Sequence, residues 1–118
     1  MKSKSFGTVK DYVKALGVVL QDAPPKHLEL LRAHARAPKH ARTAAQLAGD
    51  VGYSTYSAVN VQYGSFAHRI FDELKPHTPR PPYWVWVLVY GQSGAYDDTG
   101  HVQLFLRAEV VQALRSEE

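Results

Sequence analysis

The sequence predicts an α+β chain in which helices come first and a β-hairpin follows. Three observations lead to this class. Apolar residues recur at helical spacing over most of the first 74 positions. Residues 43–74 predict two helices joined by a glycine-marked turn, the outline of a helix-turn-helix. Residues 83–106 then contain two runs rich in aromatic and β-branched side chains, which favour strands.

Two helices are expected before the central unit. The first covers residues 9–20, where Thr8 with Asp11 forms an imperfect capping box. The second covers residues 25–36, because proline suits the first turn of a helix and residue 38 is a proline that ends it. Residues 1–7 are expected to be a flexible tail. The residues expected to face the core from the second helix are Leu28, Leu31 and Ala35.

The helix-turn-helix prediction rests on its caps and its glycines. Thr43 and Gln46 fit a capping box, and Gly52 can supply a left-handed turn after the first helix. Ser54 or Thr55 then caps the second helix. Gly64 interrupts that helix and either kinks it or divides it in two. Its core-facing residues are expected to be Val59, Tyr63, Phe66, Ala67, Ile70 and Leu74.

The C-terminal part predicts a hairpin with strands at 84–90 and 101–106, joined by a loop rich in turn residues at 91–100. A short helix follows at 107–115, with Val110, Val111 and Leu114 inward. Helices, a helix-turn-helix and then a hairpin are the order of a winged-helix domain, with the hairpin as the wing. The alternative is a small α+β domain whose hairpin joins a sheet edge or a dimer partner, since an isolated apolar hairpin must bury a face.

The composition indicates one folded domain over residues 1–118. Hydrophobic residues make up 45% of the chain, and there is no cysteine, which excludes disulfides and the commonest structural zinc sites. No apolar run approaches the roughly 20 residues that span a bilayer. The basic N-terminus lacks the apolar block of a signal peptide. We therefore expect a cytoplasmic protein with no membrane partner.

The charge distribution points to an anionic partner. The net charge is only +3, but residues 24–42 carry five Lys or Arg against one acid. A basic segment before a helix-turn-helix predicts double-stranded DNA, with phosphates held by the cations and base edges met by the second helix. A solvated helix face is the alternative, and the first turns of that helix carry no Lys or Arg. The predicted DNA-binding residues are Arg32, Arg36, Lys39, His40, Arg42, Ser54, Thr55, Ser57, Asn60, Gln62 and Arg69, with Arg80 as a further candidate.

Aromatic side chains of the hairpin suggest two other roles. Alternation would place Trp84 and Trp86 on one face of a strand. Such rings can form a platform on which exposed bases stack, together with Tyr83 and Tyr90. Aromatics in hairpins more often contact a core or a partner. The rival function is therefore a protein-interaction module or a homodimer that uses Trp84 and Trp86.

Neither a metal site nor a catalytic site is expected. The histidines are not spaced as metal ligands, since His27 and His34 lie two helical turns apart. The chain contains no G-x-S-x-G, no P-loop and no cysteine nucleophile. The acidic pair at 97–98 fits a solvated turn. We expect no cofactor, no metal and no enzymatic activity.

Residues 30–74, LLRAHARAPKHARTAAQLAGDVGYSTYSAVNVQYGSFAHRIFDEL, carry a resemblance to bacterial proteins. The pattern AP, TA-x-QLA, GY-x-x-Y-x-AVN-x-x-YG is similar to a stretch that precedes restriction-type HNH endonuclease modules. The similarity continues through the hairpin to LRAEVVQAL at 106–114 and so covers most of the chain. It implies a domain that helps to recognise DNA in a restriction, defence or regulatory system. No nuclease module follows, so cleavage is not carried over to this chain.

Overall fold

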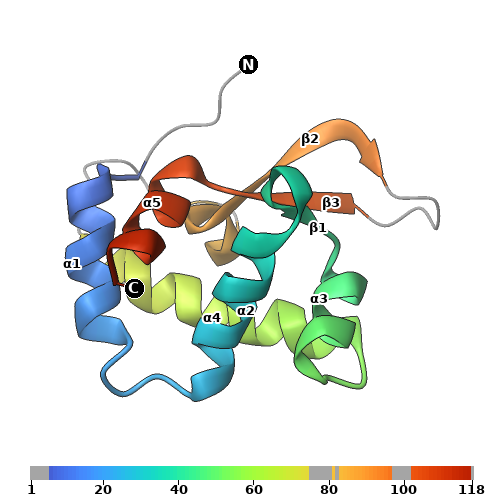
Figure 1. Ribbon diagram of the computed structural model, residues 1–118, viewed down its shortest axis with the longest axis horizontal. Coiled ribbons are helices and arrows are strands. Elements are labelled where there is room, and N and C mark those ends of the chain that lie inside the picture. Colours follow the sequence, from blue (N-terminus) through green and yellow to red (C-terminus); the bar gives the residue numbers. More distant parts are fainter. Residues whose placement is uncertain (1–5, 75–80, 82, 97–101, 118) are drawn as a thin grey trace.

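The computed structural model describes residues 6–74, 81, 83–96 and 102–117. In this part of the chain, five α-helices enclose one hydrophobic core and adjoin a three-stranded antiparallel sheet (Figure 1). The expected α+β class is therefore confirmed. The elements, with 3₁₀ helices labelled η, are α1 Val9–Val19, α2 Pro25–Arg36, η1 Pro38–His40, β1 Ala41–Arg42, α3 Ala44–Val51, α4 Tyr56–Leu74, η2 Trp84–Val87, β2 Val89–Tyr96, β3 Val102–Leu106 and α5 Ala108–Glu117.

Local capping chemistry determines where the helices begin and turn. Thr43 Oγ1 accepts a hydrogen bond from the Gln46 amide at 3.1 Å, and Gln46 Oε1 accepts one from the Thr43 amide at 2.9 Å. Thr8 and Asp11 form the same reciprocal pair at α1. Gly52 ends α3 with a φ of 83°, a left-handed conformation that favours glycine. These predicted caps and the predicted turn are confirmed.

Helix α4 lies at the centre of the fold and packs against α1, α3 and η2. It is one continuous helix of 19 residues, so the division expected at Gly64 as one of two outcomes does not occur. A glycine lowers helix stability by roughly 1 kcal/mol, which packing of the other residues outweighs here. Of the residues predicted to face the core, Leu74 is only partly buried. The others are buried: Val59, Tyr63, Phe66, Ala67 and Ile70.

The core-facing side of α2 agrees with the prediction at Leu31 and differs from it at Leu28 and Ala35. His27 and His34 are buried with Leu30 and Leu31, whereas Leu28 and Ala35 are only partly buried. The stripe of positions 27, 30, 31 and 34 follows helical spacing equally well. A search for apolar residues alone misses it because both ends of the stripe are histidines.

The first predicted strand is wrong over most of its length. Residues 84–87 form the 3₁₀ helix η2, and β2 begins at Val89 and continues to Tyr96. A strand would direct only alternate side chains toward the core, whereas the tight turn lets successive apolar residues contact α4. The loop predicted at 91–100 is strand as far as Tyr96. β2 continues to pair with β3 there, with a shift of register between Gly91 and Tyr96. The returning strand at 102–106 is confirmed.

The sheet contains a strand that the sequence did not predict. β1 is two residues long and pairs with β3, so that Ala41 faces Phe105 and Arg42 faces Leu104. The order across the sheet is β1-β3-β2. A segment this short shows no alternation, and the sequence predicted only a basic loop there. β1 places this basic segment beside the hairpin.

Both ends of the described chain pack on the helices. α5 buries Val110, Val111 and Leu114 as predicted. The flexible tail expected at 1–7 is wrong for Phe6, whose ring meets Phe71 edge-on at 6.2 Å, while residues 1–5 lie outside the described part. Within that part, no helix has the length and apolar character to cross a bilayer.

Candidate nucleic-acid interface

The predicted DNA-binding residues divide between two surfaces of the molecule. His34 faces α4, where its ring meets the Tyr63 hydroxyl. Arg32 and Arg36 lie two positions to either side of His34, which places them about 200° around the helix. They therefore lie on the side of α2 away from α4. No residue of the first turns of α4 lines the hollows beside Arg32 and Arg36.

The cations beside α2 line three adjoining hollows. The first, of about 200 Å³, is lined by Arg32, Arg36 and Arg115 together with apolar residues of α2 and α5. The second, of about 330 Å³, lies between Arg36 and Arg42. The third, of about 580 Å³, is lined by Lys39 and Arg42 beside β3. The first and second hollows share Arg36, and the second and third share Arg42. We call the cations along these connected hollows the basic track: Arg32, Arg36, Lys39, Arg42 and Arg115.

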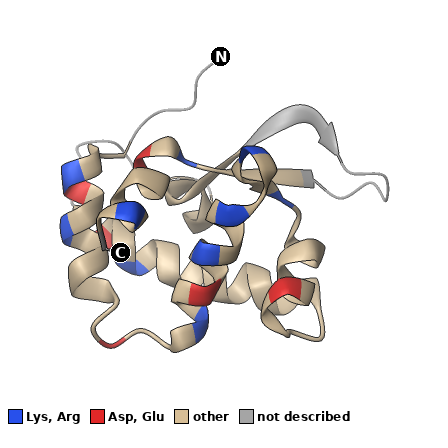
Figure 2. Ribbon diagram, in the orientation of Figure 1, with Lys and Arg blue, Asp and Glu red and all other residues tan. Residues whose placement is uncertain are grey.

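Figure 2 shows Lys and Arg positions following one another along α2 and onto the turn after it. Among the described residues that line the three hollows, Asp50 is the only acid. No ion pair is found for Arg36, Lys39 or Arg115 within the described part of the chain. The track therefore has an excess of positive charge that is open to an anion.

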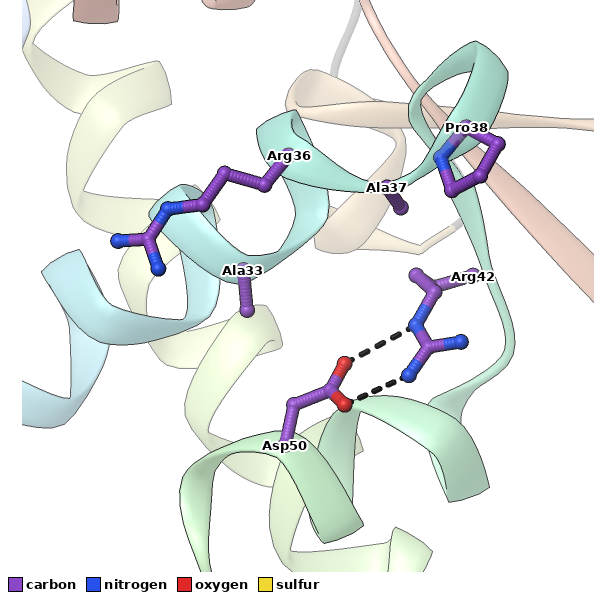
Figure 3. A pocket seen from close by; sticks show the side chains of 6 residues that line it. All are labelled: Ala33, Arg36, Ala37, Pro38, Arg42 and Asp50. Carbon is purple, nitrogen blue, oxygen red and sulfur yellow. Dashed lines mark hydrogen bonds and ion pairs between the residues drawn. The ribbon is translucent and has the colours of Figure 1, made fainter.

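Arg42 is a track cation held by a carboxylate, that of Asp50. Its Nε and Nη2 donate to the two Asp50 oxygens at 3.0 and 2.6 Å, a two-bond contact between β1 and α3. Figure 3 shows this pair face to face across the second hollow, with the Arg36 side chain extending away from it. The arrangement fixes the direction of Arg42 and neutralises part of its charge.

The turn that carries Lys39 has a costly backbone. Lys39 and His40 both adopt left-handed conformations, with φ of 57° and 56°. Each such residue other than glycine costs roughly 1 kcal/mol or more. His40 Nδ1 donates to the Ala35 carbonyl at 2.7 Å, which ties the turn back to α2. The predicted contact residue His40 thus has a structural partner, while the Lys39 side chain is exposed.

The first turns of α4 present a different, uncharged surface. Ser54, Ser57 and Asn60 are exposed, as base or phosphate contacts would require. Thr55 instead caps the helix, since its Oγ1 accepts from the Ala58 amide at 3.4 Å. Gln62 is also engaged, because its Oε1 accepts from His27 Nε2 at 2.9 Å. The Gln62 side chain, predicted to contact a base, therefore stabilises the contact between α2 and α4.

The remaining predicted cations do not extend either surface. Arg69 pairs with Asp22 in the loop between α1 and α2. Arg69, like Arg42, was predicted to contact phosphate but forms an ion pair within the protein. Arg80 lies outside the described residues.

A hydrogen-bonded histidine joins three elements beneath the track. His34 is completely buried. Its Nε2 donates to the Leu104 carbonyl at 2.8 Å, so its Nδ1 accepts from the Tyr63 hydroxyl at 2.8 Å. Burial lowers the pKa of His34 to about 4, with the hydrogen bond to Leu104 acting in the opposite direction. The ring is therefore neutral and links α2, α4 and β3.

Trp84 lies against α4, and both tryptophans belong to a 3₁₀ helix instead of a strand. Trp84 stacks on His68 with ring centroids 3.9 Å apart and also meets Phe71. Trp86 is partly buried, and its carbonyl accepts from Arg107 Nε at 2.7 Å. The predicted shared strand face is wrong because both residues belong to η2. A partner surface at Trp84 and Trp86 stays a prediction.

A stacked aromatic pair does occur on the sheet. Tyr90 and Phe105 are cross-strand neighbours whose ring centroids lie 5.4 Å apart at an angle of 18°. Tyr90 was predicted from the sequence as a stacking residue, whereas Phe105 and the track residue Arg115 were not predicted. Alternation along 102–106 could have indicated Phe105. Nothing in the sequence brings Arg115 to α2, because that requires the packing of α5.

No group of three or more metal-ligating side chains occurs within the described part of the chain. The acidic pair at 97–98 lies outside it. Comparison with known proteins adds no assignment: no family model, curated protein or solved structure matches the chain significantly. The resemblance to proteins with HNH modules therefore stays a prediction.

Proposed function

We propose that the chain is a non-catalytic DNA-binding domain that holds the phosphate backbone of double-stranded DNA on the basic track. One observation carries the proposal. Arg32 and Arg36 of α2, Lys39 of η1, Arg42 of β1 and Arg115 of α5 adjoin one another along connected hollows, with Asp50 as the only described acid among them. Guanidinium groups suit phosphate because they donate in pairs and stay charged.

We further propose that the fold is a winged helix. The strand before the helix-turn-helix pairs with the hairpin strand β3, giving the order β1-β3-β2, which supports this interpretation. Helices α3 and α4 are joined at the left-handed Gly52, as the turn of such a unit requires. A role in restriction, defence or regulation remains a prediction from the resemblance.

The basic track and the exposed start of α4 are expected to make different contributions to DNA binding. Contacts to phosphate depend on charge and not on sequence, so the track would supply affinity. Asn60 and Ser57 on α4 are exposed and could distinguish bases, but they lie on another surface. We assign the principal contact to the track because an uncharged helix face attracts DNA weakly.

The test is binding of a fluorescent duplex of mixed sequence, measured by anisotropy at several salt concentrations. If each track cation neutralises one phosphate, the slope of log affinity against log salt is roughly −4 to −5. Arg36→Glu with Arg115→Glu is expected to weaken binding by at least about tenfold and to reduce the slope by about two units.

A matched control is Lys10→Glu with Lys14→Glu on α1. It changes the net charge equally, and neither residue lines any of the three hollows. A small effect of this control beside a large effect of the track variant supports the proposal. Equal losses from both variants, or no duplex binding at low salt, would overturn it.

A further inference from the structure

A row of three cross-strand neighbours lies above the third hollow. Tyr90 pairs in register with Phe105 across β2 and β3, and Phe105 pairs with Ala41 across β3 and β1. Side chains at paired positions leave the sheet on the same side. The first two places in the row hold stacked aromatic rings. The third place holds only a methyl group, so the stack stops at Phe105.

The space beside that methyl group is the largest of the three hollows. It has a volume of about 580 Å³ and is lined by Ala41, Phe105, Gln46 and Gln103, with Lys39 and Arg42 from the basic track. Small-molecule sites commonly have volumes of a few hundred Å³ and combine an apolar wall with a few polar groups. This hollow therefore has room for a planar ring that continues the stack.

We propose that this hollow binds an unpaired nucleobase, which stacks on Phe105 as the third ring of the row while the basic track holds the adjoining phosphates. The inference rests on the proposed nucleic-acid function and specifies a strand with an unpaired nucleotide. An aromatic wall, amide side chains and adjacent cations match the three parts of a nucleotide: the π-face, the base edge and the phosphate.

The polar rim is suited to the edge of a base. Gln103 lies two positions from Phe105 on β3, so both side chains leave the sheet on the same face. Gln46 uses its Oε1 to cap α3. Its amide nitrogen remains a donor directed by that cap. Donors and acceptors from two glutamines restrict the tilt of a base without requiring one base identity.

Charge complementarity selects a nucleotide over an uncharged aromatic ligand. Lys39 is exposed at the rim, and the track continues from Arg42 to Arg36 and Arg115. A single nucleotide would use only the cations nearest the hollow, whereas a strand would use the whole track. A base that is paired and stacked within a duplex does not present its face to Phe105, so the base in the hollow must be unpaired.

The experiment compares a fluorescent oligothymidylate of about 12 nucleotides with a strand of the same length that lacks its bases. The phosphates are the same in both, so the difference in affinity reports the bases alone. We expect about tenfold weaker binding of the abasic strand. A strand containing 2-aminopurine gives a second readout, because stacking on Phe105 changes the fluorescence of that base.

Two variants locate the effect. Ala41→Phe occupies the third place with a protein ring, and Phe105→Leu removes the wall while keeping an apolar residue in the strand. Each is expected to weaken binding of the base-bearing strand about tenfold and to leave binding of the abasic strand unchanged. Ala41→Ser keeps the space, and Tyr83→Ala removes an aromatic ring that is 68% exposed and does not line the hollow. Both controls should bind like the parent chain.

The outcomes separate this inference from the proposed function. Equal binding of base-bearing and abasic strands, with duplex binding intact, would overturn the nucleobase site alone. Base-dependent binding of single strands without duplex binding would support the site and remove duplex DNA as the partner. Failure of every nucleic acid to bind at low salt would overturn both. A loss of abasic-strand binding in Ala41→Phe as large as the loss with bases would also contradict the site.

Discussion

The two sides of helix α2 have opposite chemistry. One, which we call the histidine side, comprises His27, Leu30, Leu31 and His34, and it is buried against the core. The other, the arginine side, comprises Arg32 and Arg36 and lines the basic track. Both sides carry basic residue types, yet His27 Nε2 and both ring nitrogens of His34 bond within the protein, whereas Arg36 lines two open hollows. Histidines here stabilise the fold, and the Arg36 side chain is exposed at the surface.

This contrast makes stability and binding separable by substitution. A change on the histidine side alters packing and hydrogen bonds that hold α2 to α4, so the free energy of unfolding should fall. A change on the arginine side removes a charge at the surface, where most substitutions alter stability by less than about 0.5 kcal/mol.

The largest effect is expected for His34→Leu. Leucine has a similar volume but cannot donate to the Leu104 carbonyl or accept from the Tyr63 hydroxyl. A buried hydroxyl without its partner and an imperfect fit in the core should lower the free energy of unfolding by about 3 kcal/mol. Chemical denaturation measures this, with Arg36→Ala as the control on the other side of the helix. Equal effects of both variants would remove the contrast.

The pH dependence of stability should show the same histidine. The pKa of His34 is lowered by burial from 6.5 to about 4 in the folded chain. Between these values the unfolded chain binds the proton and the folded chain does not, so stability falls as pH is lowered from 6.5 to 4. The shift corresponds to a loss of about 3 kcal/mol at most.

The pH range in which stability is lost distinguishes the effect of His34 from that of the carboxylates. The pKa values of Asp11 and Asp22 are lowered from 3.8, by hydrogen bonds with Thr8 and with Arg69, so their contributions to stability are lost only at still lower pH. Denaturation midpoints measured from pH 7 to pH 4 should therefore decline in the parent chain and change less in His34→Leu. A parallel decline in both chains would exclude His34 as its cause.

A smaller effect is expected for Tyr63→Phe. The substitution removes the hydroxyl that donates to His34 Nδ1 and leaves that accepting nitrogen buried without a donor. One lost hydrogen bond of this kind should lower the free energy of unfolding by about 1–2 kcal/mol. Combining it with His34→Leu should give less than the sum, because both changes remove the same bond. Additive losses in this double-mutant cycle would mean that the two groups act independently.

The sequence predicted features that depend on neighbouring residues better than features that depend on distant ones. Caps at Thr8, Thr43 and Gly52 are set by residues within one turn, so the predicted starts and ends of the helices agree with the structure. Long-range partners decide the rest. The segment 84–87 has strand propensity but forms η2, whose residues pack against the core, with Trp84 in contact with α4.

The candidate site was predictable only in part, for a similar reason. The local excess of charge at 24–42 pointed to Arg36 and Lys39, which line the hollows of the track. Composition could not show that Arg42 pairs with Asp50 or Arg69 with Asp22, because these carboxylates belong to other elements. Nor could it place Arg115 beside Arg36, since their proximity depends on the docking of α5.

Stability and binding should change in opposite directions at Lys39. Its left-handed backbone suits glycine, so Lys39→Gly should raise the free energy of unfolding by about 0.5–1 kcal/mol. The same change removes a cation from the basic track and should weaken DNA binding by a few fold. Lys39→Ala is the matched control, since it removes the charge and keeps the backbone strain. If both variants have the same stability, the left-handed conformation carries no cost.

The smallest effect on stability is expected at Asp50, where it tests the arginine side most directly. The pair with Arg42 is partly exposed, with 27% and 30% of the two side chains accessible, so solvent screens it and Asp50→Asn should cost about 0.5 kcal/mol or less. The substitution removes the only described acid of the track and releases the full charge of Arg42 toward a phosphate. Duplex affinity should therefore rise by a few fold at low salt, and the gain should shrink at high salt. Asp72→Asn on α4 changes the net charge equally but lies away from the track, so it should change affinity less. If Asp50→Asn weakens binding instead, the pair serves to position Arg42, and its geometry matters more to the ligand than its charge.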